Sequence, residues 1–310
     1  MPHSSIRRLF NAAKALEEQG VEVIRLDIGD PDFEMPERMA QAIKGAVDAG
    51  RTHYSPMPGL PELRRAIAQH VTQKFDLADP AIGTGLEWLK VVCSQGATQA
   101  LNACFQLACS RGDSAILPEI YFPNYMQQLC LAGIEPRFYP MDETFQPVLA
   151  SLDGLRGSGA RALLINSPSN PTGAVFPPDT VRALYEFARA EDLWIISDEA
   201  YCDYVFESEF LSPLQLDWAY PESERRVLAV FSFSKSYAAT GLRMGWTVCP
   251  SAAVAQQLGL MNEPLTGSLT TPLQHGMLAA LSEDDTGVRR SSLLELRDRA
   301  VKILAEHGIT

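Results

Sequence analysis

The stretch Leu193-Trp-Ile-Ile-Ser-Asp-Glu-Ala-Tyr201 begins as an apolar run and ends in charged and polar side chains. Two other runs have the same form, Ala162–Asn166 upstream and Val227–Ser232 downstream. A strand that is apolar throughout is covered on both faces, which is typical of a parallel sheet between layers of helices. These three runs therefore predict the centre of an α/β domain.

Further short runs alternate with segments of helical spacing on both sides of this centre. The other strands are expected at Leu89–Ser94, Ser114–Pro118, Glu135–Tyr139 and Gly245–Cys249. Helical segments between the strands are expected at Ala97–Ala108, Met126–Ala132 and Asp179–Ala190. This alternation predicts a three-layer α/β/α large domain with a seven-stranded, mostly parallel sheet.

Both ends of the chain lie outside the alternating unit. The first 20 residues read as an amphipathic helix without the apolar centre of a signal peptide, and a long helical pattern follows residue 284. We therefore predict a large domain over 41–283 and a small α+β lobe formed by 1–40 and 284–310.

Composition excludes several classes of function. The net charge of −12 argues against a nucleic-acid partner, because a polyanion requires a basic face. No apolar run approaches the length of a membrane span, so no membrane partner is expected. The six cysteines form no CxxC pair and most lie in apolar runs, which predicts buried thiols and a cytoplasmic location. The five histidines have no ligand spacing, so no metal site is expected.

Polar signatures directly follow the three central strands. They are Asn166-Ser-Pro-Ser-Asn-Pro-Thr-Gly173, Ser197-Asp-Glu-Ala-Tyr201 and Ser232-Phe-Ser-Lys-Ser-Tyr-Ala-Ala-Thr-Gly-Leu-Arg-Met-Gly245. Ligands of open parallel sheets bind outside the carboxyl ends of the strands, so one shared site is predicted. A fourth segment, Ser94-Gln-Gly-Ala-Thr-Gln-Ala100, is a strand end, a glycine turn and a helix start, which is typical of an anion site.

In this order, the four signatures resemble those of fold-type I pyridoxal-phosphate (PLP) enzymes. The resemblance is to the class I/II aminotransferases related to aspartate aminotransferase. It extends from Leu26-Asp-Ile-Gly-Asp-Pro-Asp-Phe33 to about Gly308. It implies PLP as cofactor, amino acid and 2-oxo acid as substrates, and a ping-pong transfer of the amino group.

Lys235 carries the central role in this resemblance. Taken alone, Lys235 is also compatible with a solvated surface lysine, although it follows an apolar strand. Burial or a nearby positive charge favours the unprotonated amine that a Schiff base requires. The resemblance implies that Lys235 forms the Schiff base with PLP and later moves the proton from the substrate's α-carbon.

Three residues match those that hold the ring of the cofactor. The resemblance places Asp198 against the protonated ring nitrogen, and Asn170 and Tyr201 against the phenolic oxygen, with Asn170 also in contact with the substrate. From the residues alone, Asp198 is also compatible with a helix N-cap and Asn170 with a turn. The family often has a cis proline here, which predicts a cis Asn170–Pro171 bond.

The cofactor's phosphate requires several donors. The resemblance assigns this role to five residues: Ala97, Thr98, Ser232, Ser234 and Arg243. Arginine suits the task because its planar fork donates two hydrogen bonds to a phosphate. The hydroxyl residues remain compatible with ordinary helix caps.

Other matches concern the ring face, the substrate and a second subunit. Phe122 matches the aromatic residue that stacks on the ring, and Tyr121 is the alternative. From the residues alone, Phe122 is also compatible with an ordinary core aromatic. Gly29 and Asp30 match the segment that covers the substrate. Tyr54 matches a tyrosine that reaches the neighbouring subunit's phosphate, so a homodimer is implied.

The resemblance is weakest at the C-terminus. Family members usually extend further and supply an arginine for the substrate's α-carboxylate, which Arg289, Arg290, Arg297 and Arg299 do not match. An incomplete small lobe, PLP binding and feeble or no activity are therefore expected. The alternatives are a PLP-dependent lyase or ring-forming synthase on the same fold, a PLP-binding sensor domain, and a truncated chain without activity.

Overall fold

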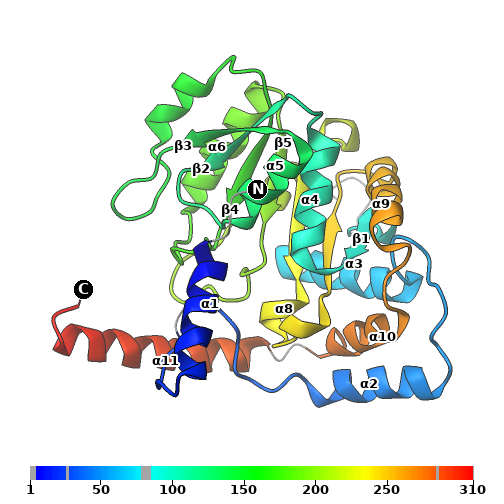
Figure 1. Ribbon diagram of the computed structural model, residues 1–310. Helices are drawn as coiled ribbons and strands as arrows, with labels where there is room; N and C mark the ends of the chain where they lie inside the picture. The colour runs from blue at the N-terminus through cyan, green and yellow to red at the C-terminus, as the bar shows by residue number, and fades with distance from the viewer. Residues whose placement is uncertain (1–4, 26–27, 78–84, 284–285, 310) are drawn as a thin grey trace.

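The structure is a computed structural model that describes residues 5–25, 28–77, 85–283 and 286–309. One sheet runs through the centre in the order β1-β7-β6-β5-β4-β2-β3 (Figure 1). Its strands are β1 Val91–Ser94, β2 Ser114–Pro118, β3 Glu135–Tyr139, β4 Ala160–Asn166, β5 Trp194–Asp198, β6 Val227–Ser232 and β7 Gly245–Val248. The predicted seven-stranded α/β fold is therefore confirmed, with strand ends within two residues of the expected ones.

The sheet is parallel except at β7, which is antiparallel to both β1 and β6. The ends of the central strands are level, because Asn166 pairs with Asp198 and Asp198 pairs with Val230. Beside them, Ser232 of β6 lies opposite Gly245, the first residue of β7. The polar residues that end these strands consequently share one edge of the sheet.

Helices cover both faces of the sheet (Figure 1). The helices are α1 Ser5–Glu18, α2 Glu37–Asp48, α3 Pro61–Phe75, α4 Gly96–Ala108, α5 Asn124–Ala132, α6 Pro178–Ala190, α7 Pro213–Trp218, α8 Phe233–Ser236, α9 Ala252–Thr266, α10 Thr271–Ala280 and α11 Thr286–Glu306. Short 3₁₀ helices lie at Trp88–Lys90, Leu149–Leu155, Glu222–Glu224 and Thr240–Leu242.

The two halves of the core lie on opposite faces of the sheet. In β5, Ile195 packs in the half formed with α3, α6 and α7, whereas Ile196 packs in the half formed with α4, α5 and α9. Successive side chains of a strand point to opposite faces, so an apolar run supplies both halves. This arrangement is the predicted three-layer α/β/α architecture.

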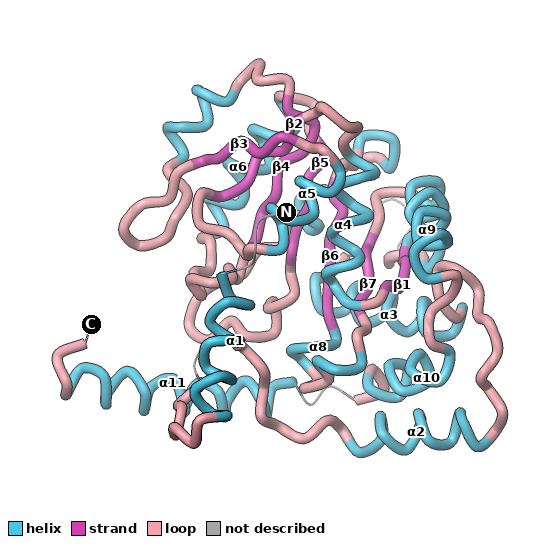
Figure 2. The backbone as a smooth tube through the Cα atoms, in the orientation of Figure 1, coloured by secondary structure: helices cyan, strands magenta, loops and turns pink. Residues whose placement is uncertain are grey.

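The segments assigned to the small lobe contain α1, the start of α2 and α11, and their described residues include no strand. The α+β character of that lobe therefore stays a prediction. Helix α11 extends beyond the edge of the sheet (Figure 2). Helix α2 packs on α10, where Arg38 donates to the carbonyl groups of Ala279 and Ala280, both at 3.1 Å.

The described part of the chain contains no helix that is both long and apolar enough to cross a membrane. All six cysteines are free thiols, and Cys93, Cys104, Cys109 and Cys249 are buried as predicted. Burial raises the pKa of the Cys93 and Cys104 thiols to about 12. These thiols are therefore core residues rather than nucleophiles.

Candidate functional site

A cavity of about 960 Å³ lies at the carboxyl ends of the central strands. Its wall includes every predicted site residue except Tyr54 and Asp30. These residues are Gly29, Ala97, Thr98, Phe122, Asn170, Asp198, Tyr201, Ser232, Ser234, Lys235 and Arg243. A larger cavity of about 1180 Å³, bounded by α2, α3 and α10, is lined by none of them. We identify the smaller cavity as the candidate site because the predicted cofactor-binding residues line it.

Lys235 lies on α8, the single helical turn that follows β6. Its Nζ atom donates to the carbonyl oxygen of Gly29 and lies 5.7 Å from the centre of the Tyr201 ring. Burial lowers the pKa of the Lys235 amine, the Asp30 carboxylate raises it, and the Arg243 guanidinium lowers it further. The net shift is downward, which favours the unprotonated amine.

Asp198 is the last residue of β5 and is buried. Its Oδ2 atom accepts a hydrogen bond of 2.6 Å from the Tyr125 hydroxyl, and Oδ1 accepts one of 3.1 Å from the Ala200 amide. Burial raises the pKa of the Asp198 carboxyl, and these two hydrogen bonds oppose the rise. Asp198 is thus part of a strand and not the N-cap of a helix.

The Asn166 side chain connects the ends of β4 and β5. Its Nδ2 atom donates to the main-chain oxygen of Asp198 at 3.2 Å, and its Oδ1 atom accepts from the amide of Asn170 at 2.9 Å. The Asn170–Pro171 bond is cis, as predicted, and so is Ser167–Pro168. These contacts place Asn170 in the cavity wall next to Asp198.

Donor groups converge at one end of the cavity. Helix α4 begins at Gly96 without a side-chain cap, so the amides of Ala97 and Thr98 have free donor capacity. Ser232 caps α8 by accepting from the amide of Ser234 at 3.0 Å. Arg243 donates to Ser234 Oγ at 3.4 Å. A helix start, two hydroxyls and a guanidinium together suit a phosphate.

This convergence depends on the absence of a side chain at Gly245. A Cβ atom there would lie 2.7 Å from the Phe231 carbonyl oxygen and 2.8 Å from the Ala97 amide nitrogen. Both neighbours are backbone atoms and have little freedom to move. Glycine at the start of β7 therefore lets the first turn of α4 approach the sheet.

The two candidates for the ring stacker differ in position. Phe122 lines the cavity. Tyr121 instead stacks on Phe138, with 5.6 Å between ring centres and 17° between planes. Tyr54 is 94% exposed and lies outside the cavity wall.

The chemistry of the cavity fits PLP. It offers an amine of lowered pKa at Lys235, an anion site at its α4 end, and a carboxylate at Asp198. The residues from 28 to 33 place Gly29 over the amine, while Leu26 and Asp27 of the same motif lie outside the described residues. Among the residues described, no cluster of side chains could hold a metal ion.

Residues 21–310 match the family described as aminotransferase class I and II. The chain belongs to this family. Its members depend on PLP and transfer amino groups, so the chain is identified as a PLP-dependent aminotransferase. This identification agrees with the donor set of the cavity.

Relatives of the aminotransferase include enzymes with several named substrates. The probable aspartate/prephenate aminotransferase of Aquifex aeolicus is 33% identical over 95% of this chain and 74% of its own length. The aspartate aminotransferase of Thermotoga maritima is 32% identical over 100% of this chain and 79% of its own. The arginine–pyruvate transaminase of Pseudomonas aeruginosa is 36% identical over 83% of this chain and 63% of its own.

Solved structures show the same fold. The aspartate aminotransferase of Thermotoga maritima superimposes on the aminotransferase with a TM-score of 0.91 and 30% identity, covering 100% of this chain and 80% of that one. A Thermus thermophilus aspartate aminotransferase double mutant gives a TM-score of 0.90 at 29% identity, covering 99% and 79%.

Four further side chains contribute to the site. The sequence did not single out Tyr125, Tyr204 or Glu207, and Arg297 was named only as an arginine that does not match the family's substrate-binding arginine. Tyr125 binds Asp198, and the Tyr204 hydroxyl donates to the Lys235 carbonyl oxygen at 2.7 Å. Arg297 and Glu207 line the outer part of the cavity as an ion pair of 3.1 Å. Tyr125 and Tyr204 each lie three residues after a predicted site residue, which is the only signal that the sequence offered.

Proposed function

We propose that the aminotransferase binds PLP in the cavity at the ends of β4, β5 and β6, with Lys235 as the residue that bonds it. The observation that carries this proposal is that Lys235, Asp198 and Arg243 line one cavity with an anion site at its α4 end. The proposed reaction moves an amino group from an amino acid to a 2-oxo acid in two half-reactions.

When bound, PLP supplies an electron sink for the electron pair left at the substrate's α-carbon. Asp198 supports this chemistry by holding a proton at the ring nitrogen with its carboxylate. Asn170 and Tyr201 are proposed to donate to the phenolic oxygen. Tyr201 lies 5.7 Å from the Lys235 amine, measured from ring centre to Nζ, and both residues line the same cavity.

Lys235 is proposed as the base and acid of both half-reactions. Its lowered pKa provides an amine that would accept the proton from the substrate's α-carbon and donate it at the C4′ position of the cofactor. The Tyr204 hydroxyl holds the Lys235 main chain, so the side chain starts from a fixed point. The carbonyl oxygen of Gly29 accepts a hydrogen bond from the same amine. Gly29 and Asn170 are both proposed to contact the substrate.

The phosphate is proposed to bind Ala97, Thr98, Ser232, Ser234 and Arg243, and Phe122 is proposed to cover one face of the ring. The position of Phe122 in the cavity wall supports it over Tyr121, which stacks on Phe138 instead.

A homodimer in which Tyr54 enters the neighbouring site is proposed for the assembly. The position of Tyr54 supports this, because its side chain is 94% exposed and lies outside the cavity wall of its own chain, where a second subunit can reach it. A large domain over 41–283 with a small lobe from 1–40 and 284–310 is proposed for the chain. The six free thiols support a cytoplasmic location.

The experiment that tests the proposal is reductive trapping. Borohydride treatment of the PLP-loaded protein is expected to leave the phosphopyridoxyl group on Lys235, identified by mass spectrometry of the peptides. The control is Lys74→Ala, because Lys74 is a second largely buried lysine that lines the other cavity. Label on another lysine would contradict the site.

Substrate screening then separates transfer from the lyase and synthase alternatives. The first amino donors are aspartate and arginine, which the names of relatives suggest, each with pyruvate, oxaloacetate or 2-oxoglutarate as acceptor. Transfer requires that a new amino acid appears in proportion to the acceptor consumed. Product formation that needs no acceptor would favour a lyase.

A further inference from the structure

Tyr125 makes a direct contact with the carboxylate that faces the cavity. It is the second residue of α5 and is 0% exposed. Its hydroxyl donates to Oδ2 of Asp198 at 2.6 Å, while the Ala200 amide donates to Oδ1 at 3.1 Å. A carboxylate oxygen accepts more than one hydrogen bond, so Asp198 keeps acceptor capacity toward the cavity.

The Tyr125 ring is held on two sides. It makes edge contacts with Phe105 at 6.4 Å and with Phe122 at 5.7 Å between ring centres. The Tyr125 amide also donates to the Phe122 carbonyl oxygen at 3.0 Å. Phe122 and Asp198 are both in the cavity wall, so Tyr125 connects two walls of one site.

The hydroxyl of Tyr125 favours the charged form of Asp198. Burial raises the pKa of Tyr125 well above its ordinary value, so the hydroxyl keeps its proton and remains a donor. The hydrogen bond favours the ionised form of Asp198 and opposes the rise that burial causes in its pKa. Without this donor, the carboxyl would be more readily protonated.

We propose that Tyr125 is a positioning residue for the ring nitrogen of PLP, and that it acts by holding Asp198 charged and correctly oriented. This inference rests on the proposed function, because Asp198 must face that nitrogen. The Tyr125 hydroxyl lies behind Asp198, so it influences the cofactor without touching it. Its ring also packs edge-on against Phe122.

The test compares cofactor affinities of Tyr125→Phe and the unmodified protein. Two probes are used: PLP, and the PLP analogue in which carbon replaces the ring nitrogen. Loss of a hydrogen bond to a charged group is expected to weaken PLP binding at least about tenfold. Binding of the analogue should stay within about twofold, since it presents no ring nitrogen to Asp198. Both constants come from absorbance titration of the apoprotein.

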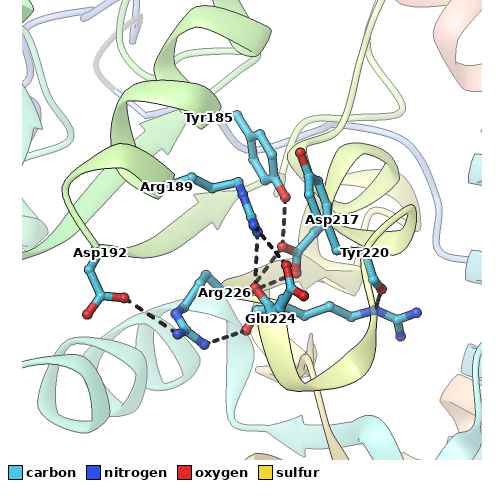
Figure 3. A network of polar contacts seen from close by, with 8 residues as sticks. Tyr185, Arg189, Asp192, Asp217, Tyr220, Glu224 and Arg226 are labelled. Atoms are coloured by element: carbon cyan, nitrogen blue, oxygen red, sulfur yellow. Dashed lines mark hydrogen bonds and ion pairs between the residues drawn. The ribbon is translucent and has the colours of Figure 1, made fainter.

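The protein contains a matched control for this substitution. Tyr185 is also buried, and its hydroxyl donates to Oδ1 of buried Asp217 at 3.0 Å (Figure 3). Neither residue lines the cavity. Tyr185→Phe removes the same kind of bond and should cost similar stability. Its affinity for both probes should equal that of the unmodified protein.

A double-mutant cycle with Asp198→Asn separates loss of this one hydrogen bond from a general loss of stability. In Asp198→Asn, the neutral amide removes the charge that Tyr125 supports. Adding Tyr125→Phe to it should weaken PLP binding by less than about twofold further, because the two residues act as one unit.

Three outcomes overturn the inference. They are unchanged PLP affinity in Tyr125→Phe, equal weakening for both probes, and independent effects of Tyr125→Phe and Asp198→Asn. Each of these leaves the proposed function standing if the unmodified protein binds PLP on Lys235. Failure of the unmodified protein to bind PLP would overturn the proposed function and this inference together.

Discussion

The guanidinium group of Arg243 lies against the backbone of Gly96, at the start of α4. A Cβ atom at Gly96 would lie only 2.7 Å from Nη2 of Arg243, and Gly96 has a φ of +74°. The positive φ favours glycine, and a side chain here would displace the Arg243 guanidinium. The contact joins the helix start and the arginine, two parts of the anion site that are far apart in the sequence.

Gly96→Ala is expected to weaken PLP binding, because the added methyl group displaces Arg243 from the donor set. It should also lower stability by about 1–2 kcal/mol, since the left-handed conformation disfavours alanine. The control is Gly112→Ala, where φ is +91° and no atom lies within 4 Å of an added Cβ. It should lose stability only. Thermal unfolding and PLP titration measure the two effects, and equal PLP affinity in both variants would contradict the prediction.

The charges around Lys235 should shift its pKa in opposite directions. In the apoprotein, acylation of Lys235 is expected to titrate below the ordinary lysine value of 10.5, mainly because of burial. Asp30→Asn removes a charge that raises the pKa, so the midpoint should fall. Arg243→Gln removes a charge that lowers it, so the midpoint should rise. Mass spectrometry of the labelled peptide gives the pH profile, and shifts of the same sign would rule out this arrangement.

Glu199 should make stability depend on pH. Burial raises the pKa of its carboxyl to about 7 from 4.5, although Ser212 donates to Oε1 at 2.6 Å. Because the folded-state pKa is raised, the stabilising contribution is complete below pH 4.5 and is lost as the pH rises through about 7. The total change is on the order of 3 kcal/mol.

Glu199→Gln mimics the neutral carboxyl and should remove this loss. Urea unfolding between about pH 4 and pH 8 measures it. Glu186→Gln makes the same chemical change at an exposed position of α6 and serves as control. The prediction fails if Glu199→Gln keeps the pH dependence of the unmodified protein.

The proposed role of Tyr54 across a dimer predicts complementation. Tyr54→Ala and Lys235→Ala should each have low aminotransferase activity as homodimers. In a hybrid dimer, the subunit with intact Lys235 receives Tyr54 from its partner, so one site is complete. Random pairing of equal amounts should restore about one quarter of the sites. Co-expression with two affinity tags isolates the hybrid, and an inactive hybrid would show that Tyr54 serves its own subunit.

Much of the fold was predictable because strand formation is governed by local pattern. The run Leu193–Ser197 is apolar up to its last residue, which is typical of a strand between two helical layers, and β5 lies there within one residue. The strand expected at Leu89–Ser94 instead begins at Val91, because Leu89 and Lys90 belong to the 3₁₀ helix Trp88–Lys90. There, Lys90 turns to pair with Glu222 at 2.6 Å, a contact with a distant segment.

By itself, the sequence determined which polar residues follow the central strands, including Asn170, Asp198 and Lys235, and the order in which they occur along the chain. Their gathering follows from one rule, that parallel strands meet at the same edge. Only the tertiary structure decided that Phe122 rather than Tyr121 faces the cavity, and that Tyr125 binds Asp198. The physical reason is that burial and hydrogen bonding depend on distances between elements distant in the chain, which no local pattern encodes.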